Sequence, residues 1–243
     1  MALTLLSIVT SFSRSANRED EDEVVSRFIK YVAKEIVLGP IVKSRGKKRH
    51  NQYALTFDDG PDPVYTPKVL SILKNHSAIA TFFLMGRKME MYPECVSAIS
   101  EAGHEIGCHT MSHRELSGAS LNLLEEEVGR FFELFDVTQP MLRPPYGKLG
   151  INLLYYTWSR RIPIVLWSLD PKDFRTSTSQ LLNFFSESPI KGGDIILLHD
   201  KTREIIEVLP RIIDDCHQRE LLPVRTSEVI GLRKEEQKKD GCA

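Results

Sequence analysis

The fold is decided by one stretch, Tyr53-Ala54-Leu55-Thr56-Phe57-Asp58-Asp59-Gly60-Pro61, in which an apolar, strand-like run ends in two adjacent carboxylates and a Gly-Pro turn. Two neighbouring aspartates repel each other unless a cation or another strong partner lies beside them. The pair therefore predicts a metal ion or an arginine supplied from elsewhere in the chain. Taken alone, the same residues also suit an ordinary turn that closes a strand, because Asp, Gly and Pro are common turn residues.

Short β-branched or aromatic runs alternate with amphipathic segments from Gln52 onward. The predicted strands are residues 53–57, 79–84, 105–108, 141–143, 164–168, 194–198 and 222–225. The predicted helices are residues 66–74, 93–102, 120–135, 149–160, 179–186 and 202–219. This alternation indicates an α/β protein with a parallel sheet and crossover helices. About seven such strands can close into a distorted (β/α) barrel.

Four further blocks of polar residues follow predicted strands. They are His109-Thr110-Met111-Ser112-His113, Arg143-Pro144-Pro145-Tyr146-Gly147, Asp170-Pro171-Lys172-Asp173-Phe174 and Leu197-Leu198-His199-Asp200. Each block, like the aspartate pair, falls at the carboxyl end of a predicted strand or in the loop after it. Those ends converge on one face of a parallel barrel, so we expect residues over a hundred positions apart to share one pocket.

His109 and His113 are four residues apart, a separation that lets two imidazoles approach one cation. With one aspartate they form a two-histidine, one-carboxylate set that leaves coordination positions open for water and substrate. The pair alone also suits a structural role. The same set describes the iron(II) triad of oxygenases. Oxygenases do not require a base and an acid paired beside the metal, whereas the further carboxylate and histidine of these blocks would supply such a pair here. We therefore rank an oxygenase below a hydrolase.

The five blocks, in this order, resemble the motifs of the polysaccharide deacetylase family, also called the NodB-homology domain or carbohydrate esterase family four. The likeness runs from about Gln52 to Gly231. The family motifs read TFDDGP, H-[S/T]-x-x-H, R-x-P-[Y/F], D-x-x-D-W and L-x-H. One residue departs from them, because Phe174 stands where the family usually has Trp. The resemblance implies a distorted barrel with fewer than eight complete units.

The resemblance also implies roles for the central residues. It assigns the metal ligands as Asp59, His109 and His113. Asp58 would be the general base that takes a proton from a metal-bound water, and His199 would be the acid that protonates the leaving amine. The ligand set suits Zn first, but Co or another divalent ion is also possible.

Five more residues would tune this chemistry according to the resemblance. Arg143 would orient the base, and Asp173 would keep the acid histidine protonated near neutral pH. The backbone N–H of Tyr146 would help hold the oxyanion. Leu197 and Phe174 would line an apolar slot for the acetyl methyl, and Phe in place of Trp predicts retained activity with altered substrate fit or rate.

The resemblance implies a metal-dependent hydrolase of linear amides, acting on carbon-nitrogen bonds other than peptide bonds. It would remove N-acetyl groups from N-acetylglucosamine in a chitin-like or peptidoglycan-like oligo- or polysaccharide. Two alternatives stay open: an O-acetyl esterase acting on acetylated xylan, and a catalytically silent sugar-binding barrel. Intact catalytic positions argue against the silent barrel.

Composition limits the possible partners. The 243 residues carry a net charge of -1 and 42% apolar residues. This near-neutral balance argues against a nucleic-acid partner, which needs a positive excess, and favours a carbohydrate substrate. The four cysteines include no C-x-x-C pair, so neither a thiolate zinc site nor a disulfide framework is indicated. The sequence leaves the oligomeric state open.

Three segments are predicted along the chain. Residues 1–49 form an N-terminal extension with a helix at 24–37 and a basic linker, residues 50–232 the NodB-homology domain, and residues 233–243 a charged tail. The basic linker is expected to be solvated. The apolar run at residues 2–12 has the length of a signal peptide but no preceding Lys or Arg, which favours the cytoplasm over secretion. No stretch reaches the roughly 20 apolar residues of a membrane span.

Overall fold

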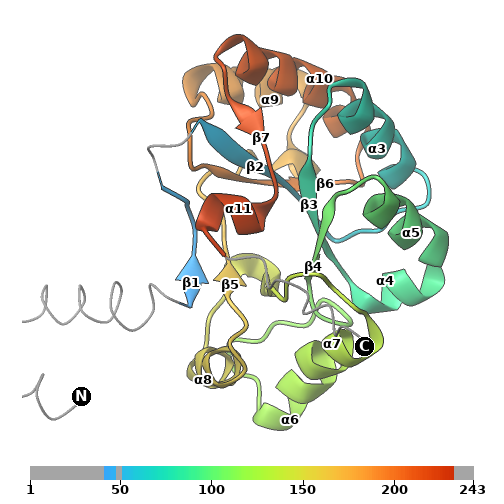
Figure 1. Ribbon diagram of the computed structural model, residues 1–243, viewed down its shortest axis with the longest axis vertical. Coiled ribbons are helices and arrows are strands. Elements are labelled where there is room, and N and C mark those ends of the chain that lie inside the picture. The colour runs from blue at the N-terminus through green and yellow to red at the C-terminus, as the bar shows by residue number, and fades with distance from the viewer. Residues whose placement is uncertain (1–40, 48–50, 233–243) are drawn as a thin grey trace, which may run out of the picture. The chain divides into compact units, whose positions relative to one another are not determined.

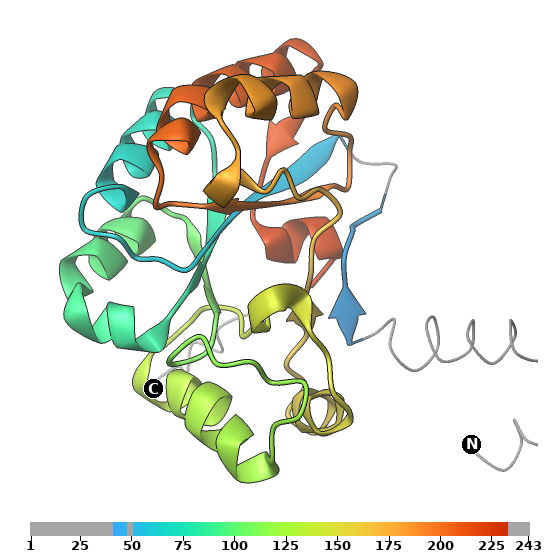
Figure 2. The ribbon, with the colours of Figure 1, turned by 180° about the vertical axis from the view of Figure 1, so that it is seen from behind.

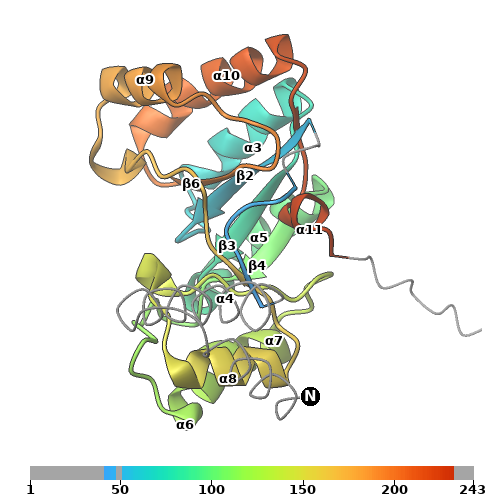
Figure 3. The same cartoon turned by 90° about the vertical axis from the view of Figure 1, so that its left-hand side faces the viewer.

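The computed structural model describes residues 41–47 and 51–232. Its main sheet contains five parallel strands: β2 (Gln52–Asp58), β3 (Ala80–Leu84), β4 (Glu105–Cys108), β6 (Ile195–His199) and β7 (Leu222–Pro223). Strand β2 lies between β3 and β6, and β7 pairs with the first residues of β2. Figure 3 shows β2 and β6 side by side beneath two helices. The predicted parallel α/β architecture is confirmed.

The register of β2 and β6 determines which polar residues lie next to one another at the end of the sheet. Asp58 is the partner of His199 on one side and of Phe83 on the other. All residues of β6 and all but the first of β2 are buried, which accounts for their continuous apolar runs. Two polar residues that are distant in sequence therefore leave the sheet at the same edge.

Single parallel bridges continue the pairing beyond β4. Cys108 pairs with Leu142, Leu142 pairs with Ile164 in β5 (Ile164–Val165), and Leu169 pairs with Ile196 in β6. The predicted strand at residues 141–143 is thus reduced to one residue, Leu142, which makes two bridges. Two prolines follow directly, and a proline has no N–H to donate to a strand ladder. The strand pairing beyond β4 is therefore irregular.

Helices cover the outside of the strands (Figure 1 and, from behind, Figure 2). The longer ones are α3 (Thr66–Asn75), α5 (Pro93–Glu101), α8 (Ile151–Ser159), α9 (Thr178–Glu187) and α10 (Arg203–Gln218). Helix α10 contacts both α3 and α9. Its buried side chains recur at helical spacing, as an amphipathic helix packed on a sheet requires.

Three helical segments differ from the predictions. The helix predicted at 120–135 is divided into α6 (Leu121–Leu124), a π turn (Glu125–Gly129) and α7 (Arg130–Leu134). Two short helices, α4 (Gly86–Met91) and α11 (Thr226–Ile230), were not predicted. Each is less than two turns long, which is too short for an apolar period to identify.

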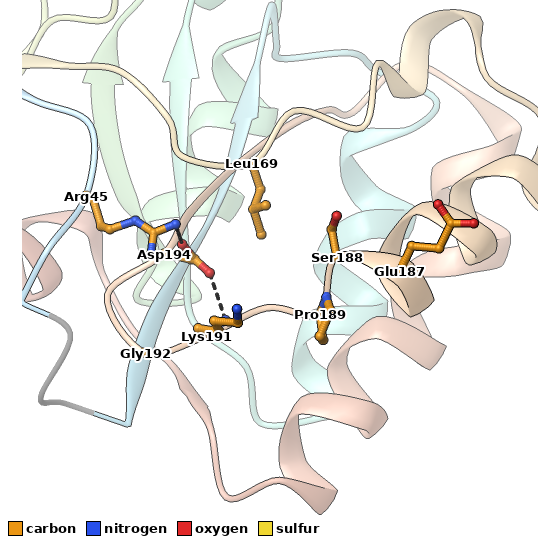
Figure 4. A pocket seen from close by; sticks show the side chains of 8 residues that line it. All are labelled: Arg45, Leu169, Glu187, Ser188, Pro189, Lys191, Gly192 and Asp194. Atoms are coloured by element: carbon orange, nitrogen blue, oxygen red, sulfur yellow. Dashed lines mark hydrogen bonds and ion pairs between the residues drawn. The ribbon is translucent and has the colours of Figure 1, made fainter.

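The basic linker is not freely solvated where the structure describes it. Gly46 donates its N–H to Gly193 O at 2.8 Å, and Lys43 O accepts from Leu166 N at 2.7 Å. Arg45 forms a 2.6 Å ion pair with the buried carboxylate of Asp194. Figure 4 shows Arg45 and the main chain at Lys191 converging on Asp194, which also accepts from Lys191 N at 2.7 Å.

This contact lies at the amino end of β6, because Asp194 precedes the strand and His199 ends it. The predicted segment boundaries at 49/50 and 232/233 stay predictions, and the helix predicted at 24–37 lies outside the described residues. Among the helices of the described ranges, none is sufficiently long and apolar for a transmembrane span.

Tyr155 and Trp158 are exposed on α8. They are 57% and 61% exposed, with ring centroids 6.4 Å apart. By contrast, Cys95, Cys108 and Cys216 are free and buried, as expected for small apolar residues.

Candidate active site

The two aspartates at the end of β2 have different partners. Asp58 is the last residue of the strand and faces Arg143, whereas Asp59 has a left-handed backbone (φ 70°) and faces two histidines. A positive φ is uncommon for a residue with a side chain, so the turn is held by its surroundings. Two adjacent carboxylates are thereby assigned to separate environments.

Arg143 is fully buried and binds Asp58 directly. Its Nη1 lies 2.7 Å from Asp58 Oδ1 and 2.6 Å from Thr56 Oγ1. Its Nε and Nη2 donate to the main-chain oxygens of Val165 and Leu166, both at 3.1 Å. Burial lowers the pKa of Arg143, and the charge of Asp58 opposes that effect. The guanidinium therefore supplies the positive partner that a buried carboxylate requires.

His109 is oriented by its other ring nitrogen. Its Nδ1 lies 2.7 Å from the main-chain oxygen of Arg143, to which only a protonated nitrogen can donate. In the neutral ring this leaves Nε2 with a free electron pair, the arrangement usual for a metal-ligating histidine. The same Arg143 thus holds Asp58 through its side chain and His109 through its carbonyl.

The atoms of Asp59, His109 and His113 converge. Asp59 Oδ1 lies 3.3 Å from His109 Nε2 and 3.1 Å from His113 Nε2, and one ligand atom from each residue lies within 4.8 Å of the others. Asp59 Oδ1 is buried, and no residue of the described chain gives it a hydrogen bond. Electron-pair donors at these distances repel one another unless a cation lies among them. The set therefore fits a divalent metal.

Charge around Asp59 keeps it ionised. Burial acts to raise the pKa of Asp59, but the His109 and His113 rings and the Lys201 ammonium outweigh it and hold the pKa well below its usual range. Lys201 Nζ lies 2.5 Å from Asp59 Oδ2, the oxygen that faces away from the histidines. An ionised carboxylate is the form that binds metal.

His199 lies near Oδ2 of Asp59 and is held in place by Asp173. Its Nδ1 lies 2.7 Å from Asp173 Oδ1, and its main-chain N–H donates to Asp173 Oδ2 at 2.7 Å. Burial lowers the pKa of His199, but Asp173 and the two strand-end aspartates outweigh it, so the pKa is raised. Nε2 lies 4.0 Å from Asp59 Oδ2 and thus faces the cation site.

A cavity of about 380 Å³ opens over these groups. Of the predicted site residues, those that line it are Asp58, Asp59, His109, His113, Tyr146, Phe174, Leu197 and His199. Arg143 and Asp173 do not line it; they lie behind Asp58 and His199 and contact them directly. The structure thus brings all ten predicted residues to one site.

The apolar side of the cavity contains Leu197, Phe174 and Trp167. Phe174 presents its ring to His199 at a centroid distance of 5.4 Å and an angle of 79°. Tyr146 has a left-handed backbone (φ 61°), and its ring meets His113 edge-on at 5.0 Å. Aromatic rings therefore adjoin both His113 and His199 at the cavity.

Sequence reasoning missed two residues of this cavity, Trp167 and Lys201. Three further lining residues belong to the quoted blocks but were given no role: Pro144, Asp170 and Lys172. Lys201 follows the fifth block by one residue, and Trp167 precedes the fourth by three. The sequence signal that could have identified them is their position close to the ends of predicted strands. A ring that packs against Gly147 also explains why that position has no side chain: an added Cβ would lie 2.8 Å from Trp167.

The fold and the site define a class: a barrel-like parallel α/β fold with an Asp-His-His set that could hold a metal at the carboxyl ends of its strands. The family model described as "Polysaccharide deacetylase" matches residues 45–159. A peptidoglycan-N-acetylglucosamine deacetylase of Bacillus cereus is 36% identical over 186 residues, which cover 73% of this chain and 87% of the relative. This chain belongs to the polysaccharide deacetylase family.

Two further comparisons agree with this assignment. A chitooligosaccharide deacetylase of Sinorhizobium fredii is 34% identical over 151 residues, or 60% of this chain and 70% of the relative. A crystal structure of a peptidoglycan N-acetylglucosamine deacetylase, in complex with 4-naphthalen-1-yl-N-oxidanyl-benzamide, superposes with a TM-score of 0.77 and 29% identity. That comparison covers 85% of this chain and 99% of the other.

Proposed function

We propose that this chain is a metal-dependent hydrolase that removes the acetyl group from N-acetylglucosamine residues of a chitin-like or peptidoglycan-like glycan. The observation that carries the proposal is that Asp58 and His199 both lie beside the Asp59, His109 and His113 set within one cavity. A base and an acid beside a metal site match the needs of amide hydrolysis. The sugar in this proposal is inferred from the names of the relatives.

The metal ligands in this proposal are Asp59, His109 and His113, with zinc as the preferred ion. Two imidazole nitrogens and one carboxylate suit zinc and leave positions open for water and substrate. When bound, such an ion lowers the pKa of a water molecule and polarises the acyl oxygen. Lys201 holds Oδ2 of Asp59, while Oδ1 faces His109 and His113.

Asp58 acts as the general base. It takes one proton from the attacking water while the water oxygen forms a bond to the acyl carbon of the N-acetyl group. The Arg143 guanidinium holds one carboxylate oxygen at 2.7 Å, while the other lies 3.9 Å from His109 Nε2 and faces the metal site. Arg143 therefore fixes the direction in which Asp58 accepts the proton.

His199 acts as the general acid. As the bond between the acyl carbon and the amide nitrogen breaks, Nε2 gives its proton to that nitrogen, which leaves as the free amine of glucosamine. Acetate is the other product. Asp173 holds Nδ1 and supports the protonated ring before the transfer.

The remaining groups hold the acyl unit. The main-chain N–H of Tyr146 stabilises the oxyanion. Tyr146 has a left-handed backbone, which is uncommon for a residue with a side chain and occurs often at functional sites. Leu197 and Phe174 form the slot for the acetyl methyl, since both line the cavity on its apolar side.

A substrate panel tests this assignment. Acetate release is measured with N-acetylglucosamine oligomers, peptidoglycan fragments and acetylated xylan at equal acetyl concentration. Faster release from the amides supports the proposal. Release from the xylan esters alone would replace it with an O-acetyl esterase, and sugar binding without any release would replace it with a silent barrel.

A further inference from the structure

The loop that carries His113 has an unusual backbone. Thr110 and His113 have φ values of 68° and 61°, although neither is glycine. Left-handed residues with side chains cost free energy and persist only where surrounding contacts hold them. Within the loop of residues 109–113, which we call the ligand loop, His113 N–H donates to Thr110 Oγ1 at 2.9 Å. The other contacts that hold the ligand loop come from outside it.

One side of the ligand loop is held by the start of α4. Gly86 N donates to Thr110 O at 2.9 Å, and Arg87 N donates to Met111 O at 3.0 Å. A Cβ added at Gly86 would lie 2.2 Å from the sulfur of Met111, so the Met111 side chain would have to move. These bonds use main-chain groups only.

The other side is held by Glu127. Its main-chain oxygen accepts from Met111 N at 2.9 Å. Its carboxylate accepts twice from Ser112: Oε2 from the main-chain N–H at 2.9 Å and Oε1 from the hydroxyl at 2.5 Å. Ser112 immediately precedes His113, so the carboxylate binds the chain one residue before a proposed metal ligand.

Glu127 reaches this position because of the π turn at Glu125–Gly129. It is buried, whereas its neighbours Glu125 and Glu126 are exposed. A buried carboxylate is costly unless hydrogen bonds satisfy it, and both oxygens of Glu127 are used on Ser112. Single π turns inside helices occur often at functional sites.

We propose that Glu127 is a positioning residue that sets the place of His113 through Ser112. The carboxylate fixes the main chain at residue 112, which fixes the left-handed turn at His113 and keeps its Nε2 3.1 Å from Asp59 Oδ1. This inference rests on the proposed function, because it assumes that His113 binds the metal.

Three variants separate positioning from general stability. Glu127→Ala removes both bonds to Ser112. Glu127→Gln keeps an amide oxygen that accepts from Ser112 N–H and an amide nitrogen that donates to the hydroxyl oxygen. Glu126→Ala is the matched control, since it removes the same charge from the adjacent exposed position of the same turn.

Metal affinity of the purified full chain is measured by competition with a chromophoric chelator, for zinc and for cobalt. The visible spectrum of the cobalt form and the thermal midpoint of the metal-free protein are recorded beside it. We expect Glu127→Ala to weaken affinity about 10- to 100-fold and to alter the cobalt spectrum. Glu127→Gln and Glu126→Ala should stay within about threefold of the parent chain, with its spectrum.

Unchanged affinity and spectrum in Glu127→Ala would overturn the inference and leave the proposed function standing. If that variant does not fold, Ser112→Ala decides the matter, because it deletes one of the two bonds: weaker affinity supports the inference and parental affinity overturns it. If the parent chain binds neither metal, the proposed function and this inference both fail.

Discussion

Asp173 binds His199 at two points, with one carboxylate oxygen 2.7 Å from the ring Nδ1 and the other 2.7 Å from the main-chain N–H. The second bond fixes the carboxylate relative to the strand end, so the ring cannot turn away from it. Burial lowers the pKa of His199, but Asp173, together with the charges of Asp58 and Asp59, outweighs that effect and raises the pKa. A histidine with a raised pKa stays protonated to a higher pH, as a general acid requires.

Asp173→Asn should therefore move the alkaline limb of kcat to lower pH. The acid works below its pKa, and loss of the neighbouring charge lowers that pKa, so activity is lost earlier as the pH rises. The profile is measured at saturating metal and substrate. An alkaline limb at the same pH as in the parent chain would contradict the role given to Asp173.

Asp58→Asn and Asp59→Asn should separate base from ligand. The first should lower kcat by about 10²- to 10⁴-fold while bound metal stays at the parental level. The second should lower metal affinity, because the remaining amide is a neutral and weaker ligand. Metal content is measured by elemental analysis after dialysis, and equal metal loss in the two variants would overturn the division of roles.

Arg143→Met should lower the free energy of unfolding by about 3–5 kcal/mol, because it leaves the carboxylate of Asp58 buried without its partner. Replacing Asp58 by Asn in the same chain should recover part of this loss without restoring activity. Both values come from denaturant unfolding. A double variant no more stable than Arg143→Met would show that the ion pair is not the source of the loss.

Asp200→Asn tests a second buried carboxylate. Thr66 Oγ1 donates to Asp200 Oδ2, while Oδ1 has no partner among the described residues. Burial raises the pKa of Asp200 from an ordinary 3.8 to about 7. Between these pH values the folded chain keeps a proton that the unfolded chain releases, so the stabilising contribution present below pH 3.8 is lost as the pH rises through 7.

The free energy of unfolding of Asp200→Asn relative to the parent chain should therefore increase from pH 4 to pH 8, by up to about 4 kcal/mol. Asn does not titrate, so the variant lacks this pH dependence. Denaturant unfolding at several pH values measures the difference. A difference independent of pH would mean that Asp200 is ionised in the folded chain across the whole range.

Phe174→Trp should change kcat or KM on at least one acetylated sugar. The Phe ring faces His199 and is 47% exposed at the cavity. An indole adds area and an N–H donor at this wall. Steady-state kinetics on a set of oligomers provide the comparison, and unchanged constants on every one of them would remove Phe174 from the specificity of the site.

The placing of the motifs could be predicted because strand ends are local features. The run that ends at Asp58 and the run that ends at His199 each read as a buried strand, and parallel strands bring such ends to one edge. The observed pairing of Asp58 with His199 follows from that rule. The resemblance to the family then supplied a proposed role for each of these motif residues.

The contacts around the site could not be predicted in the same way. Glu127 lies in a segment whose apolar period reads as one continuous helix, and only the π turn turns it toward Ser112. Lys201 and Trp167 belong to no motif, and their approach to the cavity depends on the path of loops after strands β6 and β5. Loop paths carry no periodic signal.

Acetate release from N-acetylglucosamine oligomers, before and after metal removal, tests the central claim most directly. The purified chain is assayed as isolated, after treatment with a chelator, and after zinc or cobalt is added back. We predict release that stops when the metal is removed and returns when it is restored. Release that continues at the same rate after elemental analysis shows the metal gone would contradict a metal-dependent deacetylase.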